Sequence, residues 1–199
     1  MEICTESPEA LQKAVEILKK GGVVAHATDT CYGFAASIRS EEGIKKIYAL
    51  KKMLAQKPVS ILVSDIKSAE KYGLFNATAE RFAEQYWPGQ LTIIVERTAA
   101  VPNFLNKGSA TIGLRLPAHD FSRHLVELLG CPVTTTSANV TGESSPYSAE
   151  EVFARFNSEN IQPDLIIDSG RLNKATPPST IIDCSSGAMR LIRKGSITV

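Results

Sequence analysis

A run of hydroxyl and amide side chains extends from Thr134 to Ser145. It starts in a β-branched stretch and ends in a turn that contains Gly142 and Pro146. Ligands of α/β sheets usually bind in the loops that follow strands, and short hydroxyls and amides can hold a ribose, a phosphate or a carboxylate without adding charge. A Thr-rich strand followed by a Ser/Asn turn would give the same composition, so local chemistry leaves both interpretations open.

A second polar cluster, residues 28–33 (Thr-Asp-Thr-Cys-Tyr-Gly), follows the first buried apolar segment. Gly33 allows a conformation or a close approach that other residues hinder. Asp29 is equally well explained as a cap or turn residue. Arg115 and Arg193 each lie in an apolar, strand-like segment, so each is either on a solvent face or directed at an anion.

The common catalytic and cofactor motifs are missing from the sequence. It has no GxxxxGK[ST] loop, GxGxxG fingerprint, HExxH helix or GxSxG elbow. The three histidines have no metal-ligand spacing and the four cysteines form no CxxC pair, so we predict no metal site and free thiols.

Composition is that of an ordinary globular chain. The 199 residues are 43% hydrophobic and 22% charged, with a net charge of +1, which favours one domain over residues 1–199 and argues against a polybasic nucleic-acid coat. No apolar run reaches the length of a membrane span, and the N-terminus is acidic and polar rather than a signal peptide. We therefore expect a cytoplasmic protein that makes no membrane contact.

Positive charge is concentrated in two segments. Residues 39–57 hold six basic and two acidic side chains, and residues 171–199 hold five basic and one acidic. Two independently solvated faces would explain this pattern, but convergence on one anion site would as well.

The periodicity predicts helices near 8–20, 40–51, 78–87, 121–129 and from 148, and strands near 23–25, 59–63, 91–95, 111–116, 132–136, 165–167, 180–182 and 189–192. Ser7-Pro8 starts the first helix and Gly21-Gly22 ends it. Helices alternate with strands early and strands dominate late. This order predicts an α/β fold with a twisted, mixed sheet flanked by helices.

Taken together, the polar clusters resemble motifs of the YrdC-like family of threonylcarbamoyl-AMP synthases. The matching segments occur in family order at residues 28–33, 57–59, 87–92, 113–117, 136–139, 178–183 and 192–195. They span nearly the whole chain, which corresponds to the short, single-domain form with a concave ligand-binding surface.

The resemblance implies a nucleotidyltransferase that makes L-threonylcarbamoyladenylate and pyrophosphate from L-threonine, bicarbonate and ATP, with Mg²⁺ on the nucleotide. A downstream tRNA threonylcarbamoyl transferase complex would use the product, and the sequence leaves open whether tRNA also contacts this protein. Such chemistry needs alignment and charge compensation rather than a protein nucleophile, so no catalytic side chain is singled out.

Site residues follow from the matched motifs. Thr28, Tyr32, Arg115 and Ser137 would surround threonine and its carbamate, with Arg115 on the threonine carboxylate or on a phosphate. The nucleotide would contact Lys51, Lys57, Ser137, Asn139, Ser179 and Arg193. Both basic segments would then serve one anion site.

One family feature is missing. Relatives carry Lys-x-Arg-Pro at the end of the second helix, whereas this chain reads Lys51-Lys52-Met53-Leu54. A thioether cannot donate to a phosphate. The departure motivates an alternative, a catalytically weak or inactive relative that binds RNA. A third interpretation is a carbamoyl-adenylate chemistry with another carbamoyl donor, as in hydrogenase-maturation carbamoyltransferases.

Overall fold

Side-chain caps set the helix starts. The computed structural model describes residues 1–54 and 57–199. Five of its helices begin after a Ser, Asp or Asn whose side chain accepts the backbone N–H three residues later, which satisfies a donor that the helix leaves free. The helices are α1 (Pro8–Lys19), α2 (Glu41–Leu50), α3 (Ile66–Tyr72), α4 (Ala77–Tyr86), α5 (Asp120–Leu129) and α6 (Ala149–Phe156).

The strands form one mixed sheet in the order β1-β9-β2-β3-β8-β4-β7-β6-β10-β11, with β5 on β6. The sheet contains four parallel pairs (β1·β9, β2·β9, β4·β7 and β6·β10) together with antiparallel ones such as β3·β8 and β6·β7. The strands are β1 (Glu2–Thr5), β2 (Val24–Ala27), β3 (Tyr32–Ala35), β4 (Ser60–Leu62), β5 (Gly73–Leu74), β6 (Leu91–Arg97), β7 (Thr111–Arg115), β8 (Val133–Ser137), β9 (Leu165–Asp168), β10 (Thr180–Asp183) and β11 (Arg190–Arg193).

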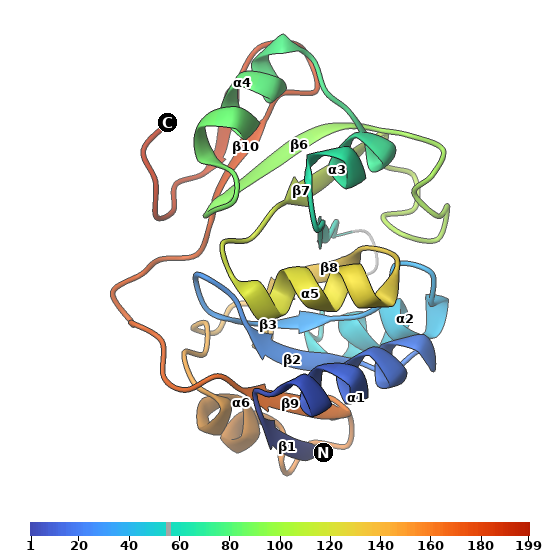
Figure 1. Cartoon of the computed structure of the whole chain (residues 1–199), viewed down its shortest axis with the longest axis vertical. Coiled ribbons are helices and arrows are strands. Elements are labelled where there is room, and N and C mark those ends of the chain that lie inside the picture. Colours follow the sequence, from blue (N-terminus) through green and yellow to red (C-terminus); the bar gives the residue numbers. More distant parts are fainter. Residues whose placement is uncertain (55–56) are drawn as a thin grey trace.

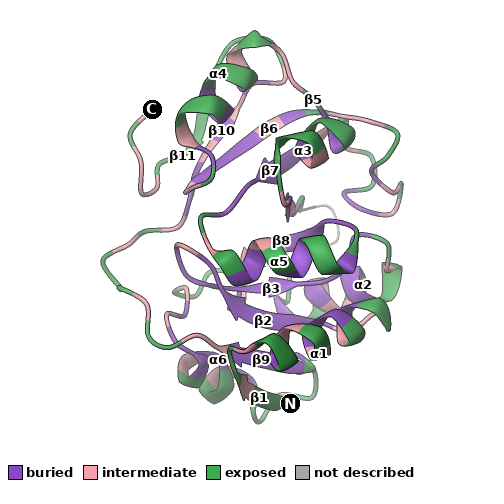
Figure 2. Ribbon diagram, in the orientation of Figure 1, coloured by how far each residue is buried: buried purple, intermediate pink, exposed green. Residues whose placement is uncertain are grey.

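Helices cover both faces of the β1-to-β4 half of the sheet. On one face, α1 and α5 pack side by side and bury a cluster that includes Leu18, Leu125 and Val133 (Figure 1). On the other face, α2 and α6 contribute Ile47 and Phe156 to the larger core. Figure 2 shows the central strands buried and the outer sides of the helices exposed.

The predicted α/β fold with a mixed sheet is confirmed, and the predicted helices and strands are present within a few residues of their expected ends. Three features were missed. β1 and β3 are only four residues each, and α3 with β5 spans just 66–74. Within the described residues, no helix combines the length and apolar composition needed to cross a bilayer.

Strand register brings the polar clusters together. Gly33 on β3 lies opposite Ser137 on β8, and Ser60 on β4 lies opposite Thr135. The next strands along, β7, β6 and β10, carry Arg115, Thr92 and the residue after Ser179. The middle of the sheet therefore positions segments that are up to 150 residues apart in sequence, by rough count.

Candidate active site

A cavity of about 400 Å³ lies where these strands meet. Its wall contains every residue that the matched motifs predicted for the site except Tyr32: Thr28, Lys51, Lys57, Arg115, Ser137, Asn139, Ser179 and Arg193. Placement in one cavity makes joint binding of one ligand feasible. The role of each side chain toward that ligand stays a prediction.

Tyr32 is the exception. It is buried, its hydroxyl donates to Gly170 O (2.7 Å), and it accepts from Ser169 N (3.0 Å). Burial raises the pKa of this phenol to about 12. Its side chain thus ties β3 to the segment that follows β9, and it is not among the residues that line the cavity.

Lys51 lies at the C-terminal end of α2 and is only 5% exposed. Its ammonium donates to the backbone carbonyls of Ser137 (2.6 Å) and Asn139 (2.9 Å), so it holds the turn after β8. Burial lowers the pKa of Lys51 to about 8, because the charged form loses hydration that two carbonyls only partly replace. A bound anion would raise this pKa again, because it stabilises the charged form.

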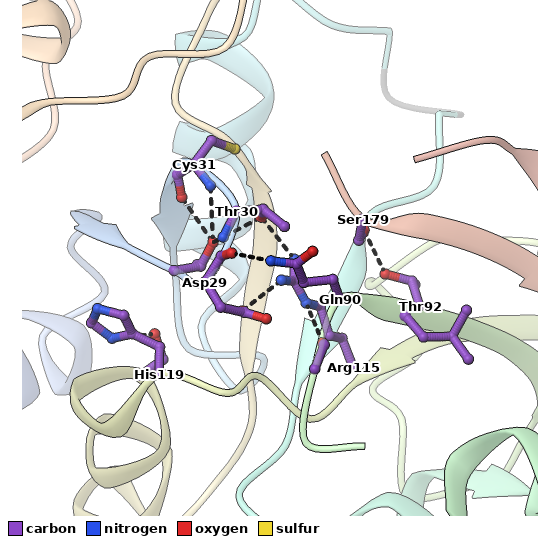
Figure 3. A network of polar contacts seen from close by, with 12 residues as sticks. Asp29, Thr30, Cys31, Gln90, Thr92, Arg115, His119 and Ser179 are labelled. Atoms are coloured by element: carbon purple, nitrogen blue, oxygen red, sulfur yellow. Dashed lines mark hydrogen bonds and ion pairs between the residues drawn. The ribbon is translucent and has the colours of Figure 1, made fainter. Parts of the chain in front are cut away.

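Arg115 is held on three sides at the end of β7 (Figure 3). Its Nη2 is 2.6 Å from Asp29 Oδ1, Nη1 donates to Thr30 Oγ1 (3.2 Å), and Nε donates to Gly89 O (3.2 Å). The side chains of Arg115 and Asp29 are 5% and 10% exposed, so the ion pair is buried. A guanidinium has five N–H donors, so two remain for other partners.

Arg193 on β11 reaches the cavity through Ser179. Its Nη2 donates to Ser179 Oγ (3.1 Å) and Ser179 O (2.7 Å), and Ser179 Oγ is 3.0 Å from Thr92 Oγ1. Gly195 makes this approach feasible, because a Cβ there would lie 2.1 Å from Pro178 O. Only a glycine lets the two chain segments come so close.

Asn139 shapes the loop at the rim. Its Nδ2 donates to the carbonyls of Val140 and Glu143, both at 2.8 Å. Its Oδ1 is buried and has no hydrogen-bond partner among the described residues. Since buried acceptors are normally paired, this oxygen is suited to a ligand donor such as an amine or a hydroxyl.

Both basic segments contribute to the cavity, but with few of their side chains. Of their eleven basic residues only Lys51, Lys57 and Arg193 line the cavity. Most of the others pair with carboxylates outside it: Lys45 with Glu41, Lys46 with Asp164, Lys52 with Glu159, Arg171 and Lys174 with Glu151, and Arg190 with Asp183. The cavity therefore has fewer cations than the segment charges suggested.

The sequence did not single out several cavity residues. Thr92, Ser60 and Glu143 line the wall. Met53, which the sequence did single out, lines it as well. Thr92 ends a matched motif, which was a usable signal. Nothing in the local sequence around Glu143 distinguishes it from a turn residue.

Comparisons with known proteins identify the family and support the fold. The family model for Sua5, YciO and YrdC proteins, described as "Telomere recombination", matches residues 16–195. A Methanocaldococcus jannaschii protein, provisionally named threonylcarbamoyl-AMP synthase, is 36% identical over 96% of this chain and 90% of its own length.

Two solved structures extend the comparison. Pyrococcus abyssi Sua5 complexed with L-threonine is 30% identical with a TM-score of 0.87, covering 98% of this chain and 56% of its own. Escherichia coli YciO is 27% identical with a TM-score of 0.87, covering 100% and 95%. The chain thus spans little more than half of the archaeal Sua5 but nearly all of YciO. On the family-model match and these relatives, it belongs to the Sua5/YciO/YrdC family.

Proposed function

We propose that this protein is a threonylcarbamoyl-AMP synthase that converts L-threonine, bicarbonate and ATP to L-threonylcarbamoyladenylate and pyrophosphate. The observation that carries the proposal is the shared cavity, which gathers predicted residues from six of the seven matched motifs, together with Lys51. Relatives with this name match over most of the chain. We further propose that the protein is a single domain and that it works in the cytoplasm. Its product would be used by a tRNA threonylcarbamoyl transferase complex.

The proposed reaction requires that threonine, bicarbonate and ATP are held in the correct relative orientation. The threonine amine adds to carbon dioxide derived from bicarbonate and loses a proton, which gives a carbamate. A carbamate oxygen then attacks the α-phosphorus of ATP, and pyrophosphate leaves with the electrons of the broken P–O bond. Each step joins small, negatively charged reactants, so orientation and charge compensation supply the rate enhancement.

Different residues of the cavity wall would serve the two substrates. The two free N–H groups of Arg115 would hold the threonine carboxylate, and Thr28 would border the same pocket. Lys51, Lys57 and Arg193 would compensate the phosphates. The hydroxyl of Ser179 and the unpaired Oδ1 of Asn139 would hold the nucleoside.

Magnesium would arrive with ATP as part of the substrate. Glu143 is the one carboxylate among the described residues that line the cavity, and no group of three or more His, Cys, Asp or Glu in the described part of the chain could hold a metal. Phosphate oxygens and water would therefore supply most ligands of the ion. This is the usual way in which Mg²⁺ accompanies a nucleotide.

The test is pyrophosphate release that requires ATP, L-threonine and bicarbonate together. Ser137→Ala should lower kcat/KM at least tenfold, since a hydroxyl beside the reacting groups is lost. Ser186→Ala, in an exposed turn outside the cavity, is the matched control and should be neutral. Release that is independent of threonine would refute the proposal.

Met53 gives the alternative its one structural support, because it puts a thioether in the cavity wall where relatives have a cation. A catalytically weak, RNA-binding relative would bind tRNA with steep salt dependence and release no pyrophosphate with threonine. Replacing threonine by other amino acids in the same assay tests the third interpretation. Direct contact with tRNA is measured in the same binding experiment.

A further inference from the structure

Asp29 makes the shortest contact to the cavity arginine, yet it does not itself line the cavity. Its Oδ1 accepts from Arg115 Nη2 at 2.6 Å, and its backbone carbonyl accepts from Gln90 Nε2 at 2.6 Å. The second contact fixes the backbone of Asp29 to the loop before β6. Figure 3 shows the Asp29 carboxylate and the Arg115 guanidinium pointing toward each other, from the loop after β2 and from the end of β7.

Ordinary capping does not explain this carboxylate. Helix caps in this chain, such as Ser7 and Asp65, accept a backbone N–H three residues later. Asp29 has no such bond among the described contacts, and its buried Oδ2 has no hydrogen-bond partner there. Because a carboxylate kept for structure normally has both oxygens paired, the contact with Arg115 is the one interaction that accounts for its burial.

We propose that Asp29 is a positioning residue with two effects on Arg115, an inference that rests on the proposed function. It fixes the plane of the guanidinium together with Thr30, so that the two free N–H groups face the cavity. It also cancels most of the positive charge of Arg115 at this end of the cavity.

Because Asp29 cancels the charge of Arg115, the part of the cavity around Arg115 should prefer a carboxylate to a polyphosphate. A zwitterion such as threonine has no net charge and gains mainly from geometry, that is, from two well-aligned N–H donors on its carboxylate. A polyphosphate gains mainly from net positive charge. Arg115 paired with Asp29 therefore selects a carboxylate, and the phosphates are left to Lys51, Lys57 and Arg193 on other parts of the wall.

Two variants separate charge from geometry. Asp29→Asn keeps an acceptor oxygen but removes the negative charge. Thr30→Val removes the acceptor of Nη1 and leaves the charge. Asp183→Asn is the matched control, because it makes the same chemical change in an ion pair with Arg190 outside the cavity.

The readouts are KM for threonine, KM for ATP, kcat, and the affinity for inorganic pyrophosphate measured by calorimetry without turnover. For Asp29→Asn we expect KM for threonine to rise about tenfold, kcat to stay within about twofold, and pyrophosphate to bind roughly fivefold more tightly. For Thr30→Val we expect a rise of about threefold in KM for threonine with unchanged pyrophosphate affinity. Asp183→Asn should alter none of these.

Tighter pyrophosphate binding is the decisive result, since damage to the fold would weaken binding of every ligand. Unchanged pyrophosphate affinity in Asp29→Asn, or parallel loss for threonine and ATP, overturns the proposal. If Asp29→Asn does not fold, the Thr30→Val variant provides the test. An unchanged KM for threonine in that variant overturns the proposal. Absence of threonine-dependent turnover in the wild-type protein would instead refute the proposed function, while the pyrophosphate comparison would still test Asp29.

Discussion

Binding of ATP should transfer a proton from solvent to Lys51 at mildly alkaline pH. The ammonium is buried against two backbone carbonyls, and its pKa of about 8 in the free protein compares with 10.5 for an exposed lysine. A phosphate oxygen within ~4 Å supplies about 4 kcal/mol at an effective dielectric constant of 20, which is enough to offset the burial. In the complex, Lys51 should therefore stay protonated well above pH 8.

The size of the effect follows from these two protonation states. Proton uptake per ATP should be ~0.1 at pH 7, ~0.5 at pH 8 and ~0.9 at pH 9, because the free lysine is increasingly neutral. Through linkage, Kd for ATP should rise about tenfold between pH 7 and pH 9. The sign is fixed: a depressed lysine pKa weakens anion binding as pH rises.

Titration calorimetry in two buffers of different ionisation enthalpy measures the uptake directly. Lys51→Met should abolish the proton uptake and the rise of Kd for ATP with pH, since the thioether cannot take up a proton. Lys57→Met is the matched control. It should weaken ATP binding but leave the change of Kd with pH as in the wild type, because this lysine is exposed. A Kd that stays within about twofold from pH 7 to pH 9 in the wild type, or an unaltered slope in Lys51→Met, would refute the reasoning.

Three further predictions concern single side chains. Met53→Arg should lower KM for ATP about fivefold in the pyrophosphate assay by restoring a bidentate phosphate donor, and an unchanged KM contradicts this. Arg193→Ala should lower kcat/KM for ATP at least tenfold, whereas Arg190→Ala on the same strand should be neutral because its ion pair is on the surface. Tyr32→Phe should reduce the free energy of unfolding in urea by about 1–2 kcal/mol through loss of the bonds to Gly170 and Ser169, with KM for threonine unchanged. A raised KM with full stability would instead place the phenol against threonine.

Local signals were sufficient for most of the fold. Ser7 before Pro8 and Ser148 before Glu151 predicted helix starts that the structure reproduces as caps. β1 and β3 escaped prediction for different reasons. β1 is an exposed edge strand with no alternation of polar and apolar residues, and β3 contains Gly33, a residue type that is depleted in strands. Pairing in the sheet, rather than propensity, makes both of them strands.

Part of the candidate site was predictable and part was not. The motif residues could be named because their types and order match a family, and all but Tyr32 line one cavity. The partners of those residues could not be named. Arg115 and Asp29 are 86 positions apart, and no local pattern says that one neutralises the other. Likewise, net charge by segment cannot distinguish Lys51 in the cavity from Lys45 in a surface pair with Glu41.

The route of the chain between β9 and β10 has a consequence for how the protein is made. β9 pairs near one end of the sheet order and β10 near the other, so residues 169–179 travel the length of the molecule (Figure 1). They deliver β10 and β11, with Ser179 and Arg193, to β6. On a ribosome, β6 and β7 emerge long before that partner, and until then the backbone groups of β6 that pair with β10 have no partner strand. A nascent chain that ends before residue 180 would therefore present an unpaired strand edge to other chains, and we expect it to aggregate more readily than the full chain.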